Sequence, residues 1–130
     1  MIKLLLLEDD HVLAESLIEL LQSENFDIVH VVNSQGALNQ TFLQNFDLFL
    51  LDVNVPLFNG FELLKNLRDS GDKTPAIFLT ALNDIASLSK GFDVGADDYI
   101  KKPFDFDELI IRINAILKKQ YHTYSNELIL

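Results

Sequence analysis

The sequence predicts an α/β domain in which helices cover both faces of a doubly wound, parallel, five-stranded sheet. Three observations lead to this prediction. Short aliphatic or β-branched runs alternate five times with segments of helical periodicity. Some of these runs are apolar throughout, which is typical of strands buried on both faces. The 130 residues, 48% of them hydrophobic, are enough for one domain with such a core.

The predicted strands are short runs bounded by acids or turn residues. The first and third are wholly apolar inside and end in acids, so we place them centrally in the sheet. The second is β-branched and aromatic, and the fourth opens on Pro75, which is an allowed place for proline in a strand. The fifth is a short run before Lys102. The strands cover residues 2–7, 26–32, 47–52, 76–79 and 97–101.

Each strand is followed by a segment in which apolar residues recur every three or four positions. Asp10 or His11 can begin the first helix, and an asparagine or aspartate at 83–84 can cap the fourth. Asp105 and Glu108 have the spacing of a capping box at the start of the last helix. The predicted helices cover residues 12–23, 35–45, 61–68 and 105–119, and the fourth runs from a cap at 83 or 84 to about 94.

Right-handed crossovers between successive strands favour the flavodoxin-like strand order 2-1-3-4-5. We therefore expect one domain over residues 1–119. Residues 120–130 lose helical periodicity and end in the apolar stub Leu128-Ile129-Leu130. We interpret them as a linker or as the start of a following domain. A tail that docks back on the domain is the alternative.

Composition excludes several classes of function. The net charge of −10 argues against binding of nucleic acid by this chain alone, because DNA binding requires clustered basic residues. The chain has no cysteine, so disulfides and thiolate chemistry are excluded. No apolar run is long enough to span a bilayer, and acids at positions 8–10 interrupt the N-terminal run before it could form a signal peptide. We expect a cytoplasmic protein without membrane contact.

Polar residues with chemical potential follow the predicted strands at their carboxyl ends, where α/β sheets place their sites. Glu8 and Asp9 follow the first strand and Asp52 follows the third, so these three carboxylates should share one crevice. Oxygen ligands in such a crevice suit Mg²⁺ or Mn²⁺. Thr80 follows the fourth strand and Lys102 the fifth. The competing interpretation, acids that only end strands and cap helices, is preferred for the neighbouring aspartate at position 10.

Asp52 is the candidate nucleophile, since a carboxylate beside a metal ion can attack a phosphoryl group. Lys102 would supply a cation to the transferred oxygens and Thr80 a hydroxyl donor. Asn54, two residues after the nucleophile, cannot act as a general acid or base, so the acyl phosphate should hydrolyse slowly. The pattern indicates a switch rather than an enzyme.

Taken together, the order and spacing of these motifs resemble the receiver domain of two-component response regulators over residues 2–119, and residues 91–116 resemble its OmpR-type subfamily. The motifs are Glu8-Asp9, Asp52 with Pro56 and Gly60, Thr80-Ala81, Gly95-Ala96-Asp97-Asp98-Tyr99 and Lys102-Pro103-Phe104. Asn59 stands where an aspartate is more usual, and Leu88 where a basic residue is common.

The resemblance implies a set of roles. A sensor histidine kinase would phosphorylate Asp52 in the presence of Mg²⁺. Thr80 would then rotate toward the phosphoryl group, Tyr99 would turn inward, and Lys102 would pair with the phosphoryl oxygens. The Lys102–Pro103 peptide bond would be cis. The metal ligands would be Glu8, Asp9, Asp52 and the backbone carbonyl of Asn54.

The resemblance also implies partners. OmpR-type receivers pair through the fourth helix, fifth strand and fifth helix when phosphorylated, and a winged-helix domain after the receiver binds DNA. The residues implied on the dimer face are Asp97, Asp98, Glu108, Arg112, Lys118 and Lys119.

Three other functions remain open at this point. An aspartyl-phosphate phosphatase of the haloacid dehalogenase type would need an acid at position 54 in place of asparagine. A flavin mononucleotide-binding protein would need a phosphate loop where acids follow the first strand. A receiver-like module that binds proteins independently of phosphorylation would share every motif. Only a measurement of phosphoryl transfer to this chain would distinguish this last function from the phosphoacceptor switch.

Overall fold

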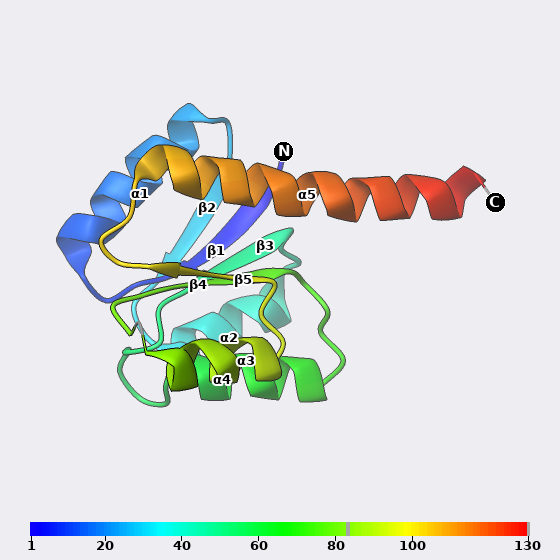
Figure 1. The fold of residues 1–130 in the computed structure, drawn as a ribbon. Coiled ribbons are helices and arrows are strands. Elements are labelled where there is room, and N and C mark those ends of the chain that lie inside the picture. The colour runs from blue at the N-terminus through cyan, green and yellow to red at the C-terminus, as the bar shows by residue number, and fades with distance from the viewer. Residues whose placement is uncertain (83, 130) are drawn as a thin grey trace.

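A computed structural model describes residues 1–82 and 84–129, the last nine of these by their backbone alone. Within that part, five strands alternate with five helices (Figure 1). The strands are β1 (Lys3–Leu7), β2 (Asp27–Val31), β3 (Leu48–Leu51), β4 (Ala76–Thr80) and β5 (Asp98–Lys101). The helices are α1 (His11–Ser23), α2 (Ser34–Leu43), α3 (Gly60–Asp69), α4 (Ile85–Asp93) and α5 (Phe106–Ile129).

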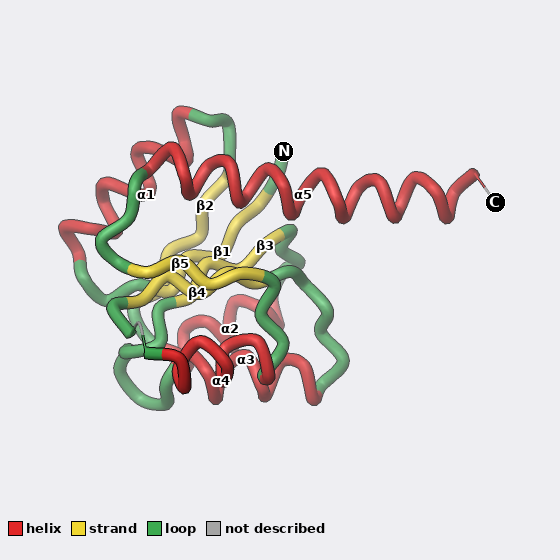
Figure 2. The backbone as a smooth tube through the Cα atoms, viewed as in Figure 1, coloured by secondary structure: helices red, strands yellow, loops and turns green. Residues whose placement is uncertain are grey.

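The strands form one parallel sheet in the order β2-β1-β3-β4-β5, which confirms the predicted order. β1 and β3 pair in register, with Leu7 opposite Leu51, so the residues that follow them emerge side by side. Figure 2 shows α1 and α5 on one face of the sheet and α2, α3 and α4 on the other. The fold is therefore the predicted doubly wound α/β sandwich.

Each face of the sheet has its own apolar core. Alternate residues of β1 and β3 point to opposite faces, as strand geometry requires. Leu4 and Leu6 pack beneath α1 and α5, whereas Leu5 and Leu7 pack against α2 and α3. Because all four leucines are buried, the central strands carry no polar face, which explains their uninterrupted apolar sequence.

Side-chain caps set where the helices begin. The Asp10 carboxylate accepts hydrogen bonds from two backbone N–H groups of α1, so this acid caps a helix as predicted. Asn33 caps α2, Asn59 caps α3 and Asp84 caps α4. Position 83, the other predicted cap of α4, lies outside the described residues. Asp105 accepts from the second N–H of α5, in agreement with the predicted start of that helix.

The structure corrects the expectation for the C-terminal segment. α5 does not end near Lys119 but continues as helix to Ile129 and projects past the sheet (Figure 1). Residues 120–129 contain neither proline nor glycine, so no helix breaker occurs in this stretch, and each further residue adds a backbone hydrogen bond. Loss of apolar periodicity therefore did not mark the end of the helix.

Candidate functional site

Three carboxylates meet at the carboxyl edge of β1 and β3. Glu8 and Asp9 follow β1, Asp52 follows β3, and the backbone N–H of Asp52 donates to the Leu7 carbonyl at 3.0 Å. One carboxylate oxygen from each acid lies within 4.8 Å of the others. Glu8 and Asp52 are buried and Asp9 is exposed. The predicted acidic cluster therefore exists, with one acid at its solvent side.

Lys102 reaches this cluster from the loop after β5. Its Nζ donates to Glu8 Oε1 at 2.5 Å and to Asp52 Oδ2 at 2.9 Å. The Glu8 side chain is 2% exposed, that of Asp52 9% and that of Lys102 19%, so these ion pairs are largely shielded from water. The Lys102–Pro103 bond is cis, as the resemblance implied. One ammonium thus bridges two buried carboxylates.

Burial and charge shift two pKa values in this cluster. Burial raises the pKa of Glu8, the nearby Asp52 charge raises it further, and the hydrogen bonds to Glu8 only partly oppose this. Burial lowers the pKa of Lys102, but the hydrogen bonds from its ammonium to both carboxylates outweigh burial and leave the pKa raised. Lys102 is therefore firmly cationic at neutral pH, and it is one basic side chain among three acidic ones.

The donor set fits a hard divalent cation. Carboxylate oxygens are the ligands that Mg²⁺ and Mn²⁺ prefer, and these ions keep several waters, which suits a cluster with one exposed acid. Asn54 is exposed beside the cluster, and its backbone N–H lies 3.4 Å from Asp52 Oδ1. A cation of this class would offset the excess of negative charge.

Thr80 and Tyr99 act on the same residue of the loop after β4. Thr80 is completely buried, and its hydroxyl accepts from the Leu82 N–H at 3.4 Å. The Tyr99 hydroxyl donates to the Leu82 carbonyl at 2.6 Å. The Tyr99 ring packs so closely on Gly91 that a Cβ there would lie 2.9 Å from a ring carbon. Both predicted switch residues thus bind the backbone of Leu82, Thr80 at its N–H and Tyr99 at its carbonyl.

The residues implied for the dimer face divide into three groups. Arg112 of α5 binds Asp98 at 2.9 Å and Glu108 at 3.0 Å within the same chain, and the pKa of Arg112 is raised by these hydrogen bonds. Asp97 instead accepts from the Ala76 N–H at 2.9 Å, at the start of β4, and lies 3.7 Å from Arg68. Lys118 and Lys119 are exposed on α5.

Two residues near the cluster were not singled out from the sequence. His30 of β2 lies with its Nε2 2.8 Å from the Glu8 carbonyl oxygen, so that nitrogen is the donor. The Ser34 side chain is completely buried and binds the loop after β3. His30 could have been found from the sheet order, which puts β2 beside β1, but no short motif marks Ser34.

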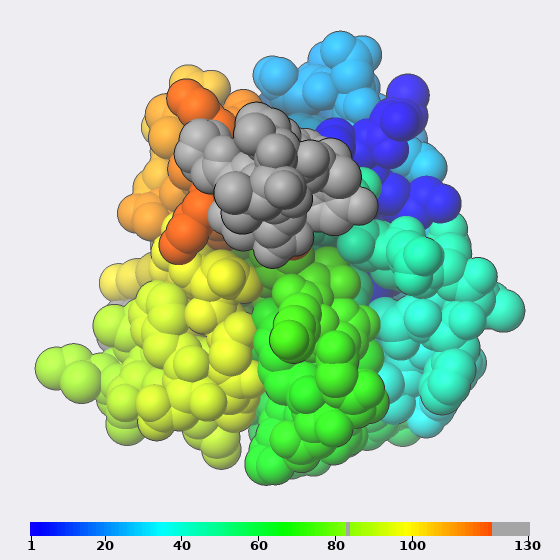
Figure 3. Space-filling model, turned by 90° about the vertical axis from the view of Figure 1, so that its right-hand side faces the viewer, coloured from blue at the N-terminus to red at the C-terminus, as the bar shows by residue number. Residues whose placement is uncertain are grey.

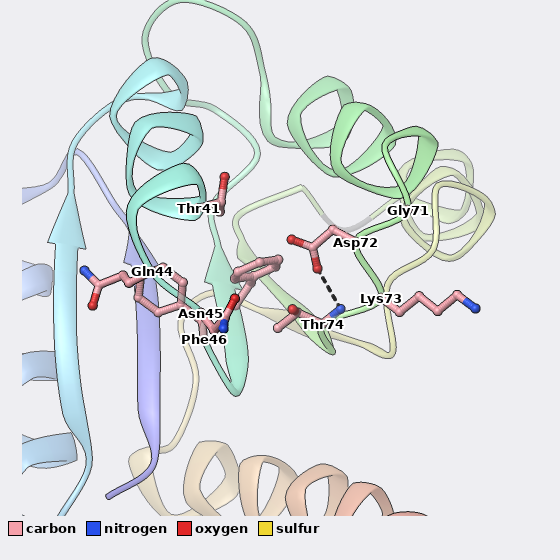
Figure 4. A pocket seen from close by; sticks show the side chains of 9 residues that line it. Thr41, Gln44, Asn45, Phe46, Gly71, Asp72, Lys73 and Thr74 are labelled. Carbon is pink, nitrogen blue, oxygen red and sulfur yellow. Dashed lines mark hydrogen bonds between the residues drawn. The ribbon is translucent and has the colours of Figure 1, made fainter.

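A separate hollow of about 300 Å³ lies at the opposite edge of the sheet, where β3 and β4 begin. Figure 3 looks onto this edge, and Figure 4 shows the hollow between the end of α2 and the loop before β4. Asp72 accepts from the Thr74 N–H at 2.9 Å, and Lys73 points away. The hollow shares no residue with the acidic cluster.

The chain matches known proteins along most of its length. Residues 4–114 match the family model of the response regulator receiver domain. The transcriptional regulatory protein CrdR of Helicobacter pylori is 46% identical over 112 residues, which are 85% of this chain and 53% of that protein. CiaR of Streptococcus pneumoniae, also a transcriptional regulatory protein, is 41% identical over 119 residues, which are 92% of this chain and 53% of that protein. This chain therefore spans about half the length of these curated relatives.

Solved structures agree. The receiver domain of the Francisella response regulator 1452 superposes with a TM-score of 0.88 at 33% identity, covering 92% of this chain and 99% of that one. The response regulator DrrB of Thermotoga maritima, an OmpR/PhoB homologue, gives 0.83 at 31% identity, covering 92% of this chain and 54% of that one. No described helix combines the length and the apolar character needed to cross a membrane.

Proposed function

Because the chain belongs to the response regulator receiver domain family, with OmpR-type transcriptional regulators among its relatives, we propose that it is a phosphoacceptor switch whose acceptor is Asp52. Receiver domains are signalling domains and not enzymes. The observation that carries the proposal is the Asp52 carboxylate, nearly buried between Glu8 and the ammonium of Lys102. A buried carboxylate between an acid and an ammonium group is better suited to accept a phosphoryl group than to end a strand.

Phosphoryl transfer at this site would balance as a simple displacement. An oxygen of the Asp52 carboxylate forms a bond to phosphorus while the bond from phosphorus to a histidine nitrogen of the kinase breaks, and that nitrogen keeps the electron pair. Lys102, already within hydrogen-bond distance of Asp52, pairs with the transferred oxygens. Thr80 offers its buried hydroxyl from the neighbouring strand end.

A divalent cation, Mg²⁺ or Mn²⁺, would neutralise negative charge on the transferred group. Its proposed ligands are Glu8, Asp9, Asp52 and the backbone carbonyl of Asn54. The side-chain amide of Asn54 neither gains nor loses a proton at neutral pH, so it cannot act as a general base that activates water against the acyl phosphate. The phosphorylated state should accordingly persist long enough to signal, which argues against the phosphatase alternative.

We assign the output to the loop held by Thr80 and Tyr99. If the Thr80 hydroxyl turns to the phosphoryl group, it gives up the Leu82 N–H, and the backbone of Leu82 then loses one of these two bonds to side chains. Tyr99 can then move inward together with that loop. The loop leads directly into α4, so α4 and β5 are the elements whose surface should change.

The proposed dimer uses this same surface, formed by α4, β5 and α5. Apolar side chains are exposed on both helices, and Arg112 of α5 pairs with Asp98 of β5 and with Glu108 of α5. The exposed apolar residues include Ile85, Leu88 and Phe92 of α4 and Ile111 of α5. Asp97, Lys118 and Lys119 complete the proposed face. Leu88, where the family commonly has a basic residue, makes the α4 side of this face more apolar.

The partners follow from this assignment. A sensor histidine kinase would supply the phosphoryl group, and a DNA-binding domain joined after α5 would carry the output, since this acidic chain is itself unsuited to DNA. Both partners place the proposed function in the cytoplasm. The projecting end of α5 is the element through which such a domain would be connected.

The chemistry can be tested through Lys102. With a small phosphodonor and Mg²⁺, we expect an adduct that hydroxylamine removes, as it removes acyl phosphates but not phosphoesters. Lys102→Ala should slow its formation by about a hundredfold, because the variant lacks the cation for the transferred oxygens. Lys101→Ala, an exposed neighbour, is the matched control. Equal rates in both variants would contradict the role of Lys102.

A further inference from the structure

Ser34, at the start of α2, makes an unusual set of bonds to the loop after β3. Its side chain is completely buried. The hydroxyl donates to the Pro56 carbonyl at 3.2 Å and accepts from the Phe58 N–H at 3.0 Å. The Ser34 backbone N–H also points to the Pro56 carbonyl, at 3.4 Å. One buried hydroxyl therefore bridges two peptides that are adjacent along the loop.

The residue between those two peptides is Leu57, whose φ is +79°. Side chains other than glycine rarely adopt this left-handed conformation, because Cβ crowds the following carbonyl. Leu57 gains little from packing to offset the strain, since 72% of its surface is exposed. Such a conformation persists only where surrounding contacts impose it. The described hydrogen bonds to the two peptides that flank Leu57 all come from Ser34, two from its hydroxyl and one from its backbone N–H.

The same loop carries the acceptor and a proposed metal ligand. Asp52 begins it, Asn54 follows, and only Val55 and Pro56 separate Asn54 from Leu57. Proline fixes its own φ, so the direction of the Pro56 carbonyl constrains the chain back toward Asn54. At its other end the loop is tied by the Gly60 N–H to the Val53 carbonyl at 2.9 Å.

Hydrogen bonds on both sides of Ser34 fix its position. Asn33 caps α2 by accepting from the Gly36 N–H at 2.7 Å, and this fixes the first turn of the helix. β2, which leads into α2, is bound to β1 next to the acidic cluster, where the Glu8 N–H donates to the Val31 carbonyl at 3.1 Å. The segment between β2 and α2 is thereby attached to both strand ends that carry the acids.

We infer that Ser34 is a positioning residue for the acidic site: its hydroxyl holds Leu57 in the left-handed conformation and so sets the course of the loop that presents Asp52 and the Asn54 carbonyl to a divalent cation. The inference rests on the proposed metal site. It adds to that site a residue that touches neither the acids nor the ion.

The test is Mg²⁺ affinity, measured by calorimetry on the whole chain. Ser34→Ala removes one oxygen and should weaken Mg²⁺ binding roughly tenfold, in line with the loss of other residues that orient metal ligands. Ser70→Ala is the matched control, because the Ser70 hydroxyl also binds a carbonyl, that of Leu67 at 2.8 Å, but far from the acids. The control should bind Mg²⁺ as the wild type does.

A double-mutant cycle separates positioning from general destabilisation. Glycine adopts the left-handed conformation without strain, so in Leu57→Gly the loop no longer needs Ser34 to hold it there. Ser34→Ala introduced into the Leu57→Gly background should therefore weaken Mg²⁺ binding only about twofold. Equal losses with and without Leu57→Gly would overturn the inference, because Ser34 would then not act through Leu57. Equal losses in Ser34→Ala and Ser70→Ala would overturn it as well.

Amide hydrogen exchange provides a readout that is independent of the metal. The Phe58 N–H should exchange more slowly than the other amides of this loop in the wild type and lose that protection in Ser34→Ala. If the wild type failed to bind Mg²⁺, the proposed metal site would fail. Unchanged Phe58 exchange in Ser34→Ala would overturn the inference about Ser34, whatever the metal result.

Discussion

At the scale of single residues, the central feature is an imbalance of charge around Lys102. Its ammonium binds Glu8 and Asp52, yet Asp9 adds a third carboxylate within 4.8 Å. Like charges at such distances repel appreciably where water is largely excluded. The site therefore holds excess negative charge that a divalent cation or a lost carboxylate would relieve.

Asp52→Asn tests this imbalance. The variant loses one attraction, to Lys102, and two repulsions, from Glu8 and Asp9. We expect its free energy of unfolding without divalent metal to rise by about 1 kcal/mol. Urea unfolding in a chelating buffer measures the change. A variant that is less stable than the wild type would show that the Lys102 pair outweighs the repulsion.

The same variant should respond weakly to Mg²⁺. In the wild type, Mg²⁺ at a hundred times its Kd should add about 2.7 kcal/mol to the free energy of unfolding, because only the folded chain assembles the site. Asp52→Asn should gain much less. NaCl at matched ionic strength controls for general screening of the net charge of −10. Equal gains from MgCl₂ in both proteins would argue against a clustered acid site.

Glu8 predicts a dependence on pH. Burial raises its pKa in the folded chain, so the folded state holds this proton more tightly than the unfolded chain does. The stability from Glu8 is present below its ordinary pKa and is lost as pH rises through the raised value. Glu8→Gln has no such proton, so its unfolding free energy should decline less between pH 4.5 and pH 7. Parallel pH profiles, measured by chemical unfolding, would contradict the raised pKa.

At the scale of elements, the start of α3 is the junction on which Asp52 depends. Gly60 is the first residue of that helix, and a Cβ at this position would overlap the backbone of Asp52 and Val53. Backbone atoms cannot move aside as a flexible side chain can. The close approach therefore requires glycine and couples the helix to the acceptor.

Gly60→Ala should lower the free energy of unfolding by about 2 kcal/mol, as overpacking of a tight site does. Gly36→Ala is the matched control, since a Cβ there would mainly meet the Asn33 and Val31 side chains, and alanine favours the helix. Thermal and urea unfolding compare the two variants. If Gly60→Ala lost no more free energy of unfolding than Gly36→Ala, the start of α3 could move away from Asp52 and Val53 at little cost, and glycine would not be required there.

The elements also show how far sequence patterns reach. Apolar runs and helical spacing predicted every strand and helix of residues 1–119 within a few positions, because a two-faced core demands those patterns. The prediction that helical structure ends near Lys119 was wrong. A helix can continue without an apolar face where the sequence contains no helix breaker. Periodicity detects packing, and it reports helix ends only where packing ends them.

At the scale of the whole molecule, the site is assembled from residues up to 94 positions apart, as in the bond from Lys102 to Glu8. Residue types and strand ends predicted its members, because parallel strands deliver their carboxyl ends to one edge. The bonds of Ser34 could not be predicted, since they depend on where the loop after β3 passes the start of α2. Only the folded chain reveals which side chain holds which loop.

The switch itself makes a prediction for the whole chain. A phosphoryl analogue such as beryllofluoride with Mg²⁺ should shift the chain from monomer toward dimer in sedimentation experiments. Ile111→Glu should block this shift, because it places a charge within the exposed apolar part of the proposed face. Phe42→Glu, an exposed apolar residue of α2 on the other side of the sheet, should not. Identical behaviour of the two variants would move the dimer elsewhere.

The most direct test of the central claim is the intact mass of the chain after incubation with a small phosphodonor and Mg²⁺. We predict a single phosphoryl adduct that is absent from Asp52→Asn and absent when the metal is chelated. No adduct on a chain that demonstrably binds Mg²⁺ would contradict the claim and leave a receiver fold that binds partners independently of phosphorylation. An adduct that persists in Asp52→Asn would contradict the assignment of the acceptor.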